Sequence, residues 1–301
     1  MDGNDRNKDA DDIESRHSAE GTGCNHSAYF VENERSYLKS SLVYRFPVDH
    51  EEVIRQDRQQ CIFSKSLSGL FRGPAVELAF GPLQWRNLAP LQHDTNRRNC
   101  TFMTVDASTG LHVFADGSFD VIHICQMLHA LDSYPALIAH AHRLLRSGGM
   151  LLIHEPQLQL HSAYTSFNLV DLSPNLTRMM DYITTAFQYR GVDTDLFSMM
   201  DQIIVEAGFH SDLISTHYYY RSACPEDPES DLGQHEILNV ISFAYATRYM
   251  ILESGVTDED DFDNLLSGLS DEVRGRSTGR AGPLGAQGVL SPWGYWWATK
   301  S

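Results

Sequence analysis

The sequence has no long uninterrupted apolar run, and this absence excludes one class of protein. Its apolar stretches are strand-sized, although 42% of its 301 residues are hydrophobic. A membrane-spanning helix needs about 20 consecutive apolar residues, so we expect no such helix. The amino-terminal residues are polar and acidic and lack the apolar core of a signal peptide. We therefore expect a cytoplasmic protein without a membrane partner, with the nucleus as the alternative location.

Positive charge and clustered cysteines are also scarce, which excludes two kinds of site. The chain has 23 Lys and Arg against 40 Asp and Glu, a formal net charge of −17. Because a nucleic-acid-binding surface needs a basic stripe, we expect no nucleic-acid partner. The five cysteines, at positions 24, 61, 100, 125 and 224, form no CxxC pair and no ligand-spaced cluster with histidine. They are typical of reduced thiols, and we expect no metal site.

The composition divides the chain into a tail and one domain. Residues 1–27 are rich in Asp, Asn, Ser and Gly and predict a disordered acidic tail. Residues 28–301 predict one α/β domain. Its expected parts are an N-terminal helical lid at 28–72, a core at 73–156, a helical cap at 157–192, and further strands and helices of the same domain at 193–301.

Strand and helix patterns alternate within the core. Residues 76–80, 101–105, 119–124 and 150–154 have the apolar or alternating pattern of strands. Residues 136–146 have one apolar helical face, and Gly148-Gly149 separates this helix from the next strand. A strand, a helix and a second strand in this order predict a βαβ unit. The sheet should therefore be mostly parallel and covered by helices.

Four flanking segments have clear local signals. Asp49 can cap a helix, with Glu52 in the capping-box position and Glu51 four residues before Arg55. The acidic run 258–263 predicts a helix start, since carboxylates favour that end. Tyr218–Tyr220 predicts a strand with alternating burial. Residues 291–300, with three tryptophans, predict a final edge strand, more readily than a ligand cage.

Four stretches together resemble the class I methyltransferases that use S-adenosyl-L-methionine (SAM). They are FPVDHEEVIRQDRQQCIF, VELAFGP, the run from FADGSFDVIH to HALDSYPALIAHAHRLLRSGGMLLIHE, and MMDQIIVEAGF with the closing PWGYWWATK. More narrowly, they resemble a fungal family of secondary-metabolite cluster methyltransferases and a velvet-associated regulator. The resemblance implies a Rossmann-like fold, SAM as cofactor, a small-molecule substrate, and a protein partner in a biosynthetic or regulatory complex.

The resemblance also implies roles for individual residues. It places Glu77 at the acidic position of the first strand, and Ala79 and Gly81 in the cofactor-binding turn. Asp106 and Ala107 match the position that reads the adenine edge, although Asp106 can also be a strand-end turn cap. Cys125 follows the next strand and should floor the pocket.

No catalytic residue follows from the resemblance. His129, His154 and Glu155 lie near the carboxyl ends of predicted strands, where ligands bind in such sheets. The chain has 14 histidines, and each of these two is more often a surface or structural residue than a catalytic one. The catalytic base therefore stays open.

The chain departs from the family pattern in two ways. Leu83 stands where the last glycine of the turn belongs, and its Cβ opposes close approach of a ligand. Only 19 residues separate Gly81 from Thr101. Two crossovers and a strand need roughly 29 residues, so one strand and its ribose-binding carboxylate should be missing, and a misread splice site would leave the same gap. The alternative function is therefore a catalytically impaired scaffold or regulatory protein that binds a pathway intermediate or a partner.

Overall fold

A computed structural model describes residues 29–39, 46–66, 76–79, 107, 109–131, 133–222, 231–275 and 288–301. Several sequence-based expectations lie outside these residues. They are the tail 1–27, the turn at Gly81 and Leu83, the short interval 82–100, the strand 101–105, Asp106, and most of the loop 274–288.

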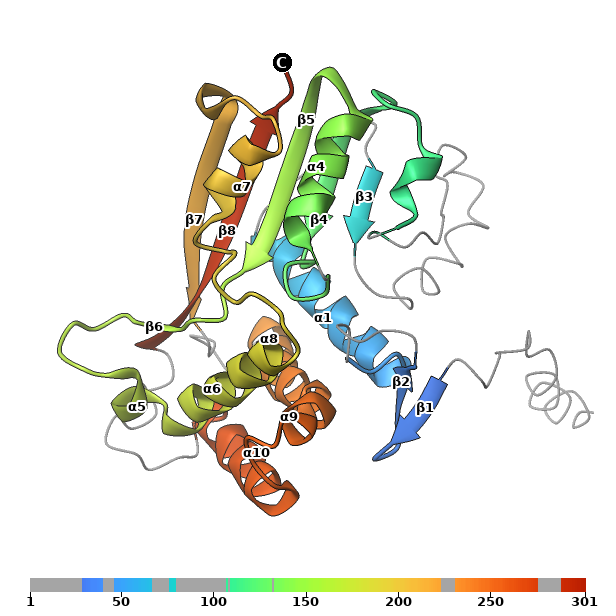
Figure 1. The fold of residues 1–301 in the computed structure, drawn as a ribbon. Coiled ribbons are helices and arrows are strands. Elements are labelled where there is room, and N and C mark those ends of the chain that lie inside the picture. Colours follow the sequence, from blue (N-terminus) through green and yellow to red (C-terminus); the bar gives the residue numbers. More distant parts are fainter. Residues whose placement is uncertain are drawn as a thin grey trace, which may run out of the picture.

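A six-stranded mixed sheet forms the centre of the described structure (Figure 1). Its strands are β3 (Val76–Ala79), β4 (Phe119–Cys125), β5 (Leu145–Pro156), β6 (His161–Ser162), β7 (Ile214–Ser222) and β8 (Val289–Thr299). The order is β3-β4-β5-β8-β6, and β7 also pairs with β8. Strands β3, β4 and β5 run parallel, whereas β8 is antiparallel to β5, β6 and β7. The α/β class is confirmed, and the parallel pairing is confined to the first half of the described sheet.

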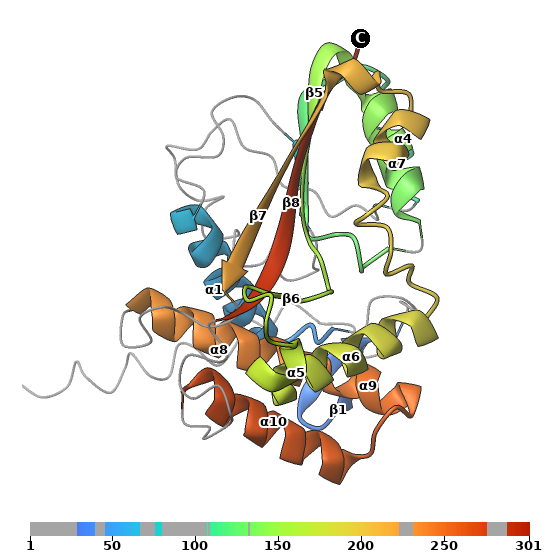
Figure 2. The same ribbon diagram turned by 90° about the vertical axis from the view of Figure 1, so that its left-hand side faces the viewer.

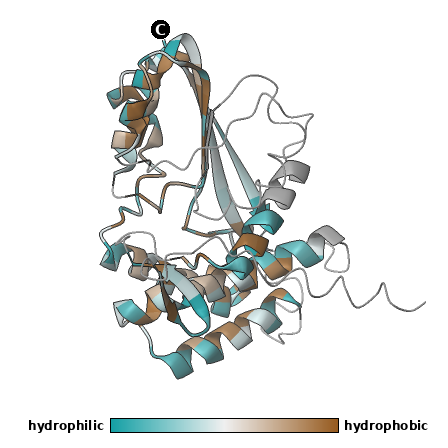
Figure 3. Ribbon diagram, turned by 90° about the vertical axis from the view of Figure 1, so that its right-hand side faces the viewer, coloured by the Kyte–Doolittle hydropathy of each residue, from teal (hydrophilic) through white to brown (hydrophobic). Residues whose placement is uncertain are grey.

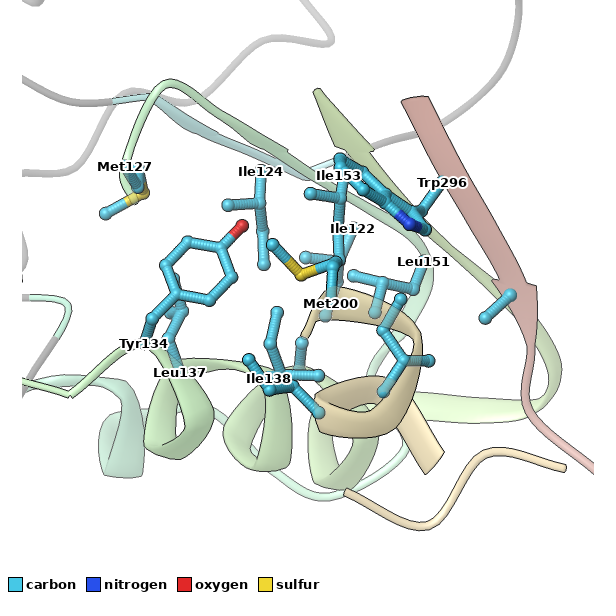
Figure 4. Packing of buried hydrophobic residues seen from close by; sticks show 14 of the residues in the cluster. Ile122, Ile124, Met127, Tyr134, Leu137, Ile138, Leu151, Ile153, Met200 and Trp296 are labelled. Carbon is cyan, nitrogen blue, oxygen red and sulfur yellow. The ribbon is translucent and has the colours of Figure 1, made fainter. Parts of the chain in front are cut away.

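The predicted βαβ unit is present as β4, α4 (Tyr134–Leu144) and β5. Ser133 caps α4, since its hydroxyl oxygen accepts from the backbone N–H of Ala136 at 3.3 Å. Helix α4 and α7 (Met200–Glu206) cover one face of the sheet (Figure 2). Side chains from the two helices and from β4, β5 and β8 form one hydrophobic core there (Figure 4). Its centre contains Ile122, Ile124, Leu137, Ile138, Leu151, Ile153, Met200 and Trp296.

A helical cap lies beyond the carboxyl ends of the parallel strands (Figures 1 and 2). Its helices are α1 (His50–Ser66), α5 (Leu169–Leu172), α6 (Pro174–Tyr189), α8 (Asp231–Ala246), α9 (Arg248–Ser254) and α10 (Glu259–Val273). Hydrophobic and hydrophilic residues alternate along these helices, as expected of amphipathic segments (Figure 3). Their apolar faces form a second core, separate from the core on the sheet. The cap therefore combines the predicted helices before the first strand and within 157–192 with three helices from the later part of the chain.

Shorter elements complete the described part of the fold. They are the antiparallel hairpin of β1 (Tyr29–Glu32) and β2 (Arg35–Leu38) and two 3-10 turns at Leu111–Val113 and Ser211–Leu213. Among the described helices, none combines the length and the hydropathy that a bilayer crossing demands.

The structure corrects one prediction about the sheet. Residues 289–299 do not form an edge strand, because β8 pairs with β5 along one side and with β7 along the other. The edge strand is β7, and its predicted alternation is confirmed: Tyr218 and Tyr220 are exposed by 46% and 56%, whereas Tyr219 is partly buried. The tryptophans of β8 therefore lie on an interior strand of the sheet.

A second correction concerns ion pairs on α1. The predicted Glu51–Arg55 pair is replaced by a buried Glu52–Arg55 pair, in which Arg55 Nη2 lies 2.6 Å from Glu52 Oε1. Glu51 instead lies 3.6 Å from Arg35. The Asp49 cap is confirmed, since its Oδ1 accepts from the Glu52 backbone N–H at 3.1 Å. Glu52 makes no capping-box bond because its carboxylate faces Arg55.

Candidate functional site

The carboxyl ends of β3 and β4 lie side by side. Their parallel register pairs Ala79 with Cys125 and Glu77 with His123. Two predicted cofactor-binding positions, Ala79 and Cys125, are thus neighbours at the edge where ligands bind in open parallel sheets. Glu77 is the second residue of β3, two residues before its end, and its side chain lies outside what the structure describes.

Of the other predicted cofactor positions, the structure describes only Ala107. Ala107 is partly buried and packs against the core between α4 and the sheet. Gly81 and Asp106 lie outside the described residues. Whether Glu77 and Asp106 share one cleft therefore stays a prediction, as do the cofactor roles of all six residues.

The backbone turns sharply where β4 ends. Gln126 has a φ of 56°, which is unusual for a residue with a side chain. Its backbone N–H donates to the carbonyl oxygen of His154 on β5 at 3.1 Å, which fixes the turn. Such strained residues gather at ligand sites. This turn directs the chain from the sheet edge toward the cap.

Glu155, at the end of β5, holds the segment that follows this turn. Its carboxylate is fully buried and accepts hydrogen bonds from the backbone N–H groups of Met127 (2.9 Å) and Leu128 (3.2 Å). The hydroxyl of Tyr134 donates to Oε1 of the same carboxyl at 3.1 Å. Burial raises the pKa of Glu155 to about 8, although its three donors oppose the shift. Glu155 therefore joins the end of β5 to the segment after β4 and to α4.

A cavity of about 220 Å³ lies between the carboxyl ends of β4 and β5 and the cap. Gln126, His129 and Ala130 line it from the segment after β4, and the residues from Glu155 to Leu158 line it from the end of β5. The cap contributes side chains of α1, α6, α8 and α10. The cavity thus opens beside the strand ends at which the sequence predicts a cofactor.

The walls of this cavity are of two kinds. Aliphatic and aromatic side chains predominate on the α6 side, including Leu176, Met179, Met180, Ile183 and Phe187. Polar side chains come from α1 and α8, at 52, 55, 56 and 59 and at 236 and 239. Their spacing places each set on one face of its helix.

The charged groups in the polar wall are paired. Glu52 and Arg55 form the buried pair on α1, and Arg221 of β7 lies 2.6 Å from Glu236 of α8. The Arg55 guanidinium also lies 5.6 Å from the centre of the Phe243 ring. Each cation in the wall therefore has a carboxylate partner.

Of the three proposed proton-accepting residues, two line the cavity. His129 contacts the Phe187 ring at 5.1 Å between centroids, and burial lowers the pKa of His129 to about 4. Its imidazole is therefore neutral at physiological pH. Glu155 also lines the cavity, with its carboxylate already bonded to three donors.

His154 does not line the cavity. Its side chain is 2% exposed, with Nε2 bonded to the Tyr219 hydroxyl and Nδ1 3.9 Å from the Cys125 sulfur. Burial lowers the pKa of His154 to about 3. The structure therefore favours the structural interpretation for this residue.

Comparison with protein families now bears on this arrangement. Residues 83–153 match the family model described as a methyltransferase domain. This stretch covers less than half of the chain, and it includes β4, α4 and most of β5. The methyltransferase domain is of class I, whose cofactor is SAM. No curated protein matches the chain.

Solved structures give weaker likenesses. Phosphoethanolamine N-methyltransferase 2 of Haemonchus contortus, solved with S-adenosylhomocysteine, is 15% identical over 65% of this chain and 36% of its own, with a TM-score of 0.32. The chain thus spans about a third of that protein's length. A protein of Anabaena variabilis assigned as an antibiotic-pathway methyltransferase is 12% identical over 81% and 96% of the two chains, with a TM-score of 0.42. The cyclopropane synthase MmaA2 of Mycobacterium tuberculosis is 16% identical over 80% and 84%, with a TM-score of 0.35. At such values these likenesses carry no argument about activity.

The polar wall of the cavity was not predicted from the sequence. Glu52, Arg55, Gln56 and Gln59 have helical spacing, which by itself is typical of a solvent-facing surface. This polar face is buried because α8 packs against α1, and the sequence does not show that contact. The one available signal was an acid and a base three residues apart on a helix that also had an apolar side.

Proposed function

We propose that this protein transfers a methyl group from SAM to a small molecule held in the cavity beneath the cap. The observation that carries the proposal is the position of the cavity, beside the carboxyl ends of parallel strands in a methyltransferase-type βαβ unit. The proposal includes a role in fungal secondary metabolism, which rests on the four sequence stretches described above.

The cofactor would be held at the ends of β3 and β4. Ala79 and Cys125 are neighbours there, and the cavity begins at the next residue, Gln126. We assign Glu77, Gly81, Asp106 and Ala107 to the same site from their positions in the sequence motif. When bound, SAM supplies an activated methyl group with its own leaving group. The protein's contribution is then to orient the acceptor and to keep water from it, for which the apolar α6 side of the cavity is suited.

His129 is the residue best placed to accept a proton from the acceptor. Its imidazole is neutral, lines the cavity and follows β4 within four residues. A neutral imidazole can accept a proton from a hydroxyl or amine as the new bond forms. Phe187 holds the ring against the apolar wall.

Isothermal titration of the purified chain with SAM and with S-adenosylhomocysteine tests the proposal. We expect saturable binding below millimolar concentration. Folding should be verified first by circular dichroism, so that a lost fold is not mistaken for a lost site. A folded protein that binds neither compound at millimolar concentration contradicts the proposal.

The second candidate function is a methyltransferase-derived scaffold that binds a pathway intermediate or partner without transferring methyl. Leu83 in place of a turn glycine and the short interval 82–100 favour it. The two functions differ in the effect of Glu77→Ala on the pathway's product. A scaffold predicts an unchanged product level, and an enzyme predicts its loss.

A further inference from the structure

Two amide side chains of the cavity wall have buried oxygens without partners. Gln56 on α1 and Asn239 on α8 both line the cavity, and their helices pack against each other. Among the residues that the structure describes, Gln56 Oε1 and Asn239 Oδ1 are buried and have no hydrogen-bond donor. Buried acceptors of this kind are rare in folded proteins because losing water without replacement is unfavourable. A ligand bound in the cavity can supply the donor that the described residues do not.

The orientation of Gln56 is fixed by its neighbour. Its Nε2 donates to Glu52 Oε1 at 3.1 Å. Exchanging the amide oxygen and nitrogen would place the oxygen against this carboxylate, which is repulsive. The free end of Gln56 is thus an acceptor. It calls for an O–H or N–H donor.

The charge of the wall limits the ligand further. Glu52 and Arg55 pair with each other, as do Arg221 and Glu236. Glu155 accepts from three protein donors, and burial keeps the pKa of His129 at about 4, so its ring carries no positive charge. The wall therefore offers no net positive charge that would offset the desolvation of an anion.

We infer that Gln56 and Asn239 form a pair of hydrogen-bond acceptors. They select an uncharged, largely apolar ligand that bears a hydroxyl or N–H group. The α6 side of the cavity takes the apolar body, and the α1–α8 side takes the donor. That the ligand is a methyl acceptor rests on the proposed function. The recognition itself depends only on the cavity.

Three matched naphthalenes test the inference by fluorescence titration. They are 2-naphthol, which carries a donor, 2-methoxynaphthalene, which lacks one, and 2-naphthoate, which is an anion. We expect wild-type protein to bind 2-naphthol about tenfold more tightly than 2-methoxynaphthalene, and 2-naphthoate most weakly. Equal binding of the first two, a preference for the anion, or no binding of any compound at millimolar concentration overturns the inference.

Leucine substitutions then locate the preference. Gln56→Leu and Asn239→Leu should each remove most of the tenfold preference while 2-methoxynaphthalene binds as well as before. Both variants should fold, because each removes a buried amide oxygen that has no partner and keeps a side chain of similar size. Gln56→Leu also removes the bond to Glu52, whose carboxylate keeps its bonds from Arg55, and thermal unfolding checks both variants. Gln188→Leu, which changes an exposed amide on α6 outside the cavity, should leave all three affinities unchanged. An undiminished preference in both cavity variants contradicts the assignment.

The same proteins separate this inference from the proposed function. Titration with S-adenosylhomocysteine reports the cofactor site without involving Gln56 or Asn239. Cofactor binding without donor selectivity rejects the inference alone. Donor selectivity without cofactor binding rejects the proposed methyl transfer and leaves the recognition standing.

Discussion

Glu155 shows how one residue joins three parts of the fold. Its buried carboxyl receives the backbone N–H groups of Met127 and Leu128 and the hydroxyl of Tyr134. The first two follow the strained turn at Gln126, and Tyr134 begins α4. The sequence placed Glu155 at a strand end but could not show these donors, because they lie 21 to 28 residues away along the chain.

Replacement of Glu155 should be costly. Glu155→Ala leaves three buried donors without an acceptor, so we expect the free energy of unfolding to fall by about 3 kcal/mol or more. Urea denaturation measures the loss. Glu155→Gln keeps a neutral acceptor of the same shape and should lose less. Glu206→Ala, at an exposed position on α7, should change stability by less than about 0.5 kcal/mol. Equal stability of Glu155→Ala and Glu206→Ala contradicts the assigned role.

His154 predicts a pH dependence of stability. Burial lowers the pKa of His154 from 6.5 to about 3, so between these values the unfolded chain binds one more proton than the folded chain. The stabilisation is complete above pH 6.5 and is lost as the pH falls toward 3. Urea denaturation at several pH values between 5 and 6 gives the slope of the free energy of unfolding against pH. This slope should be lower for His154→Gln than for wild type by up to about 1.4 kcal/mol per pH unit. Identical slopes contradict a neutral, buried His154.

At the scale of elements, local signals in the sequence were reliable and pairing was not. The predicted helix at 136–146 is present at Tyr134–Leu144, and the acidic start at Asp258 and the alternating strand at Tyr218–Tyr220 are present as predicted. The end of the helix was wrong, because Gly148 and Gly149 lie within β5 rather than between the helix and the strand. The position of β8 within the sheet depends on partners far away in the chain, and periodicity does not encode it. Aromatic residues suit either an edge or an interior strand, so residues 291–300 were wrongly placed at the edge.

Two adjacent tryptophans on β8 give a matched test of which face of the strand packs on the core. Trp296 is fully buried against Phe197 and Tyr218, whereas Trp297 on the opposite face is 36% exposed. We expect Trp296→Ala to lower the free energy of unfolding by about 3–5 kcal/mol. Trp297→Ala should cost clearly less, because it leaves a smaller cavity. Chemical denaturation of both variants measures the difference, and equal losses contradict the assignment of Trp296 to the face that packs on the core.

At the scale of the whole molecule, the described structure has two hydrophobic cores, and residues of the cap core line the cavity. One core lies between the sheet and α4 with α7, and the other lies within the cap. The sequence predicted the α/β class and a cap, because each depends on amphipathic segments. It did not predict the polar wall, since Gln56 and Asn239 are brought together by the packing of α1 on α8 across more than 180 residues.

Because the cap has its own core, we expect a substitution in the cap to weaken ligand binding in the cavity more than cofactor binding. Glu272 of α10 holds the start of α6, since its carboxylate accepts from the backbone N–H groups of Asn175 (3.0 Å) and Leu176 (3.1 Å). Glu272→Ala should loosen α6 and raise the Kd for 2-naphthol about tenfold, because α6 lines the cavity.

Cofactor affinity provides the internal comparison for this variant. The Kd for S-adenosylhomocysteine should stay within about twofold of wild type, as the cofactor is assigned to the strand ends. Glu259→Ala, an exposed position on the same helix, should change neither value. A parallel loss of both affinities in Glu272→Ala shows that the cap and the sheet do not bind independently.

The interior position of β8 also affects how the chain folds during its synthesis. Sixty-six residues, 223–288, separate β7 from β8, and a ribosome adds them in roughly 3 to 13 seconds at about 5–20 residues per second. Throughout that interval β7 has emerged without the strand it pairs with, and β5 presents an open edge. While β8 is still missing, the nascent protein is therefore open to chaperones and to aggregation at the edges of β5 and β7.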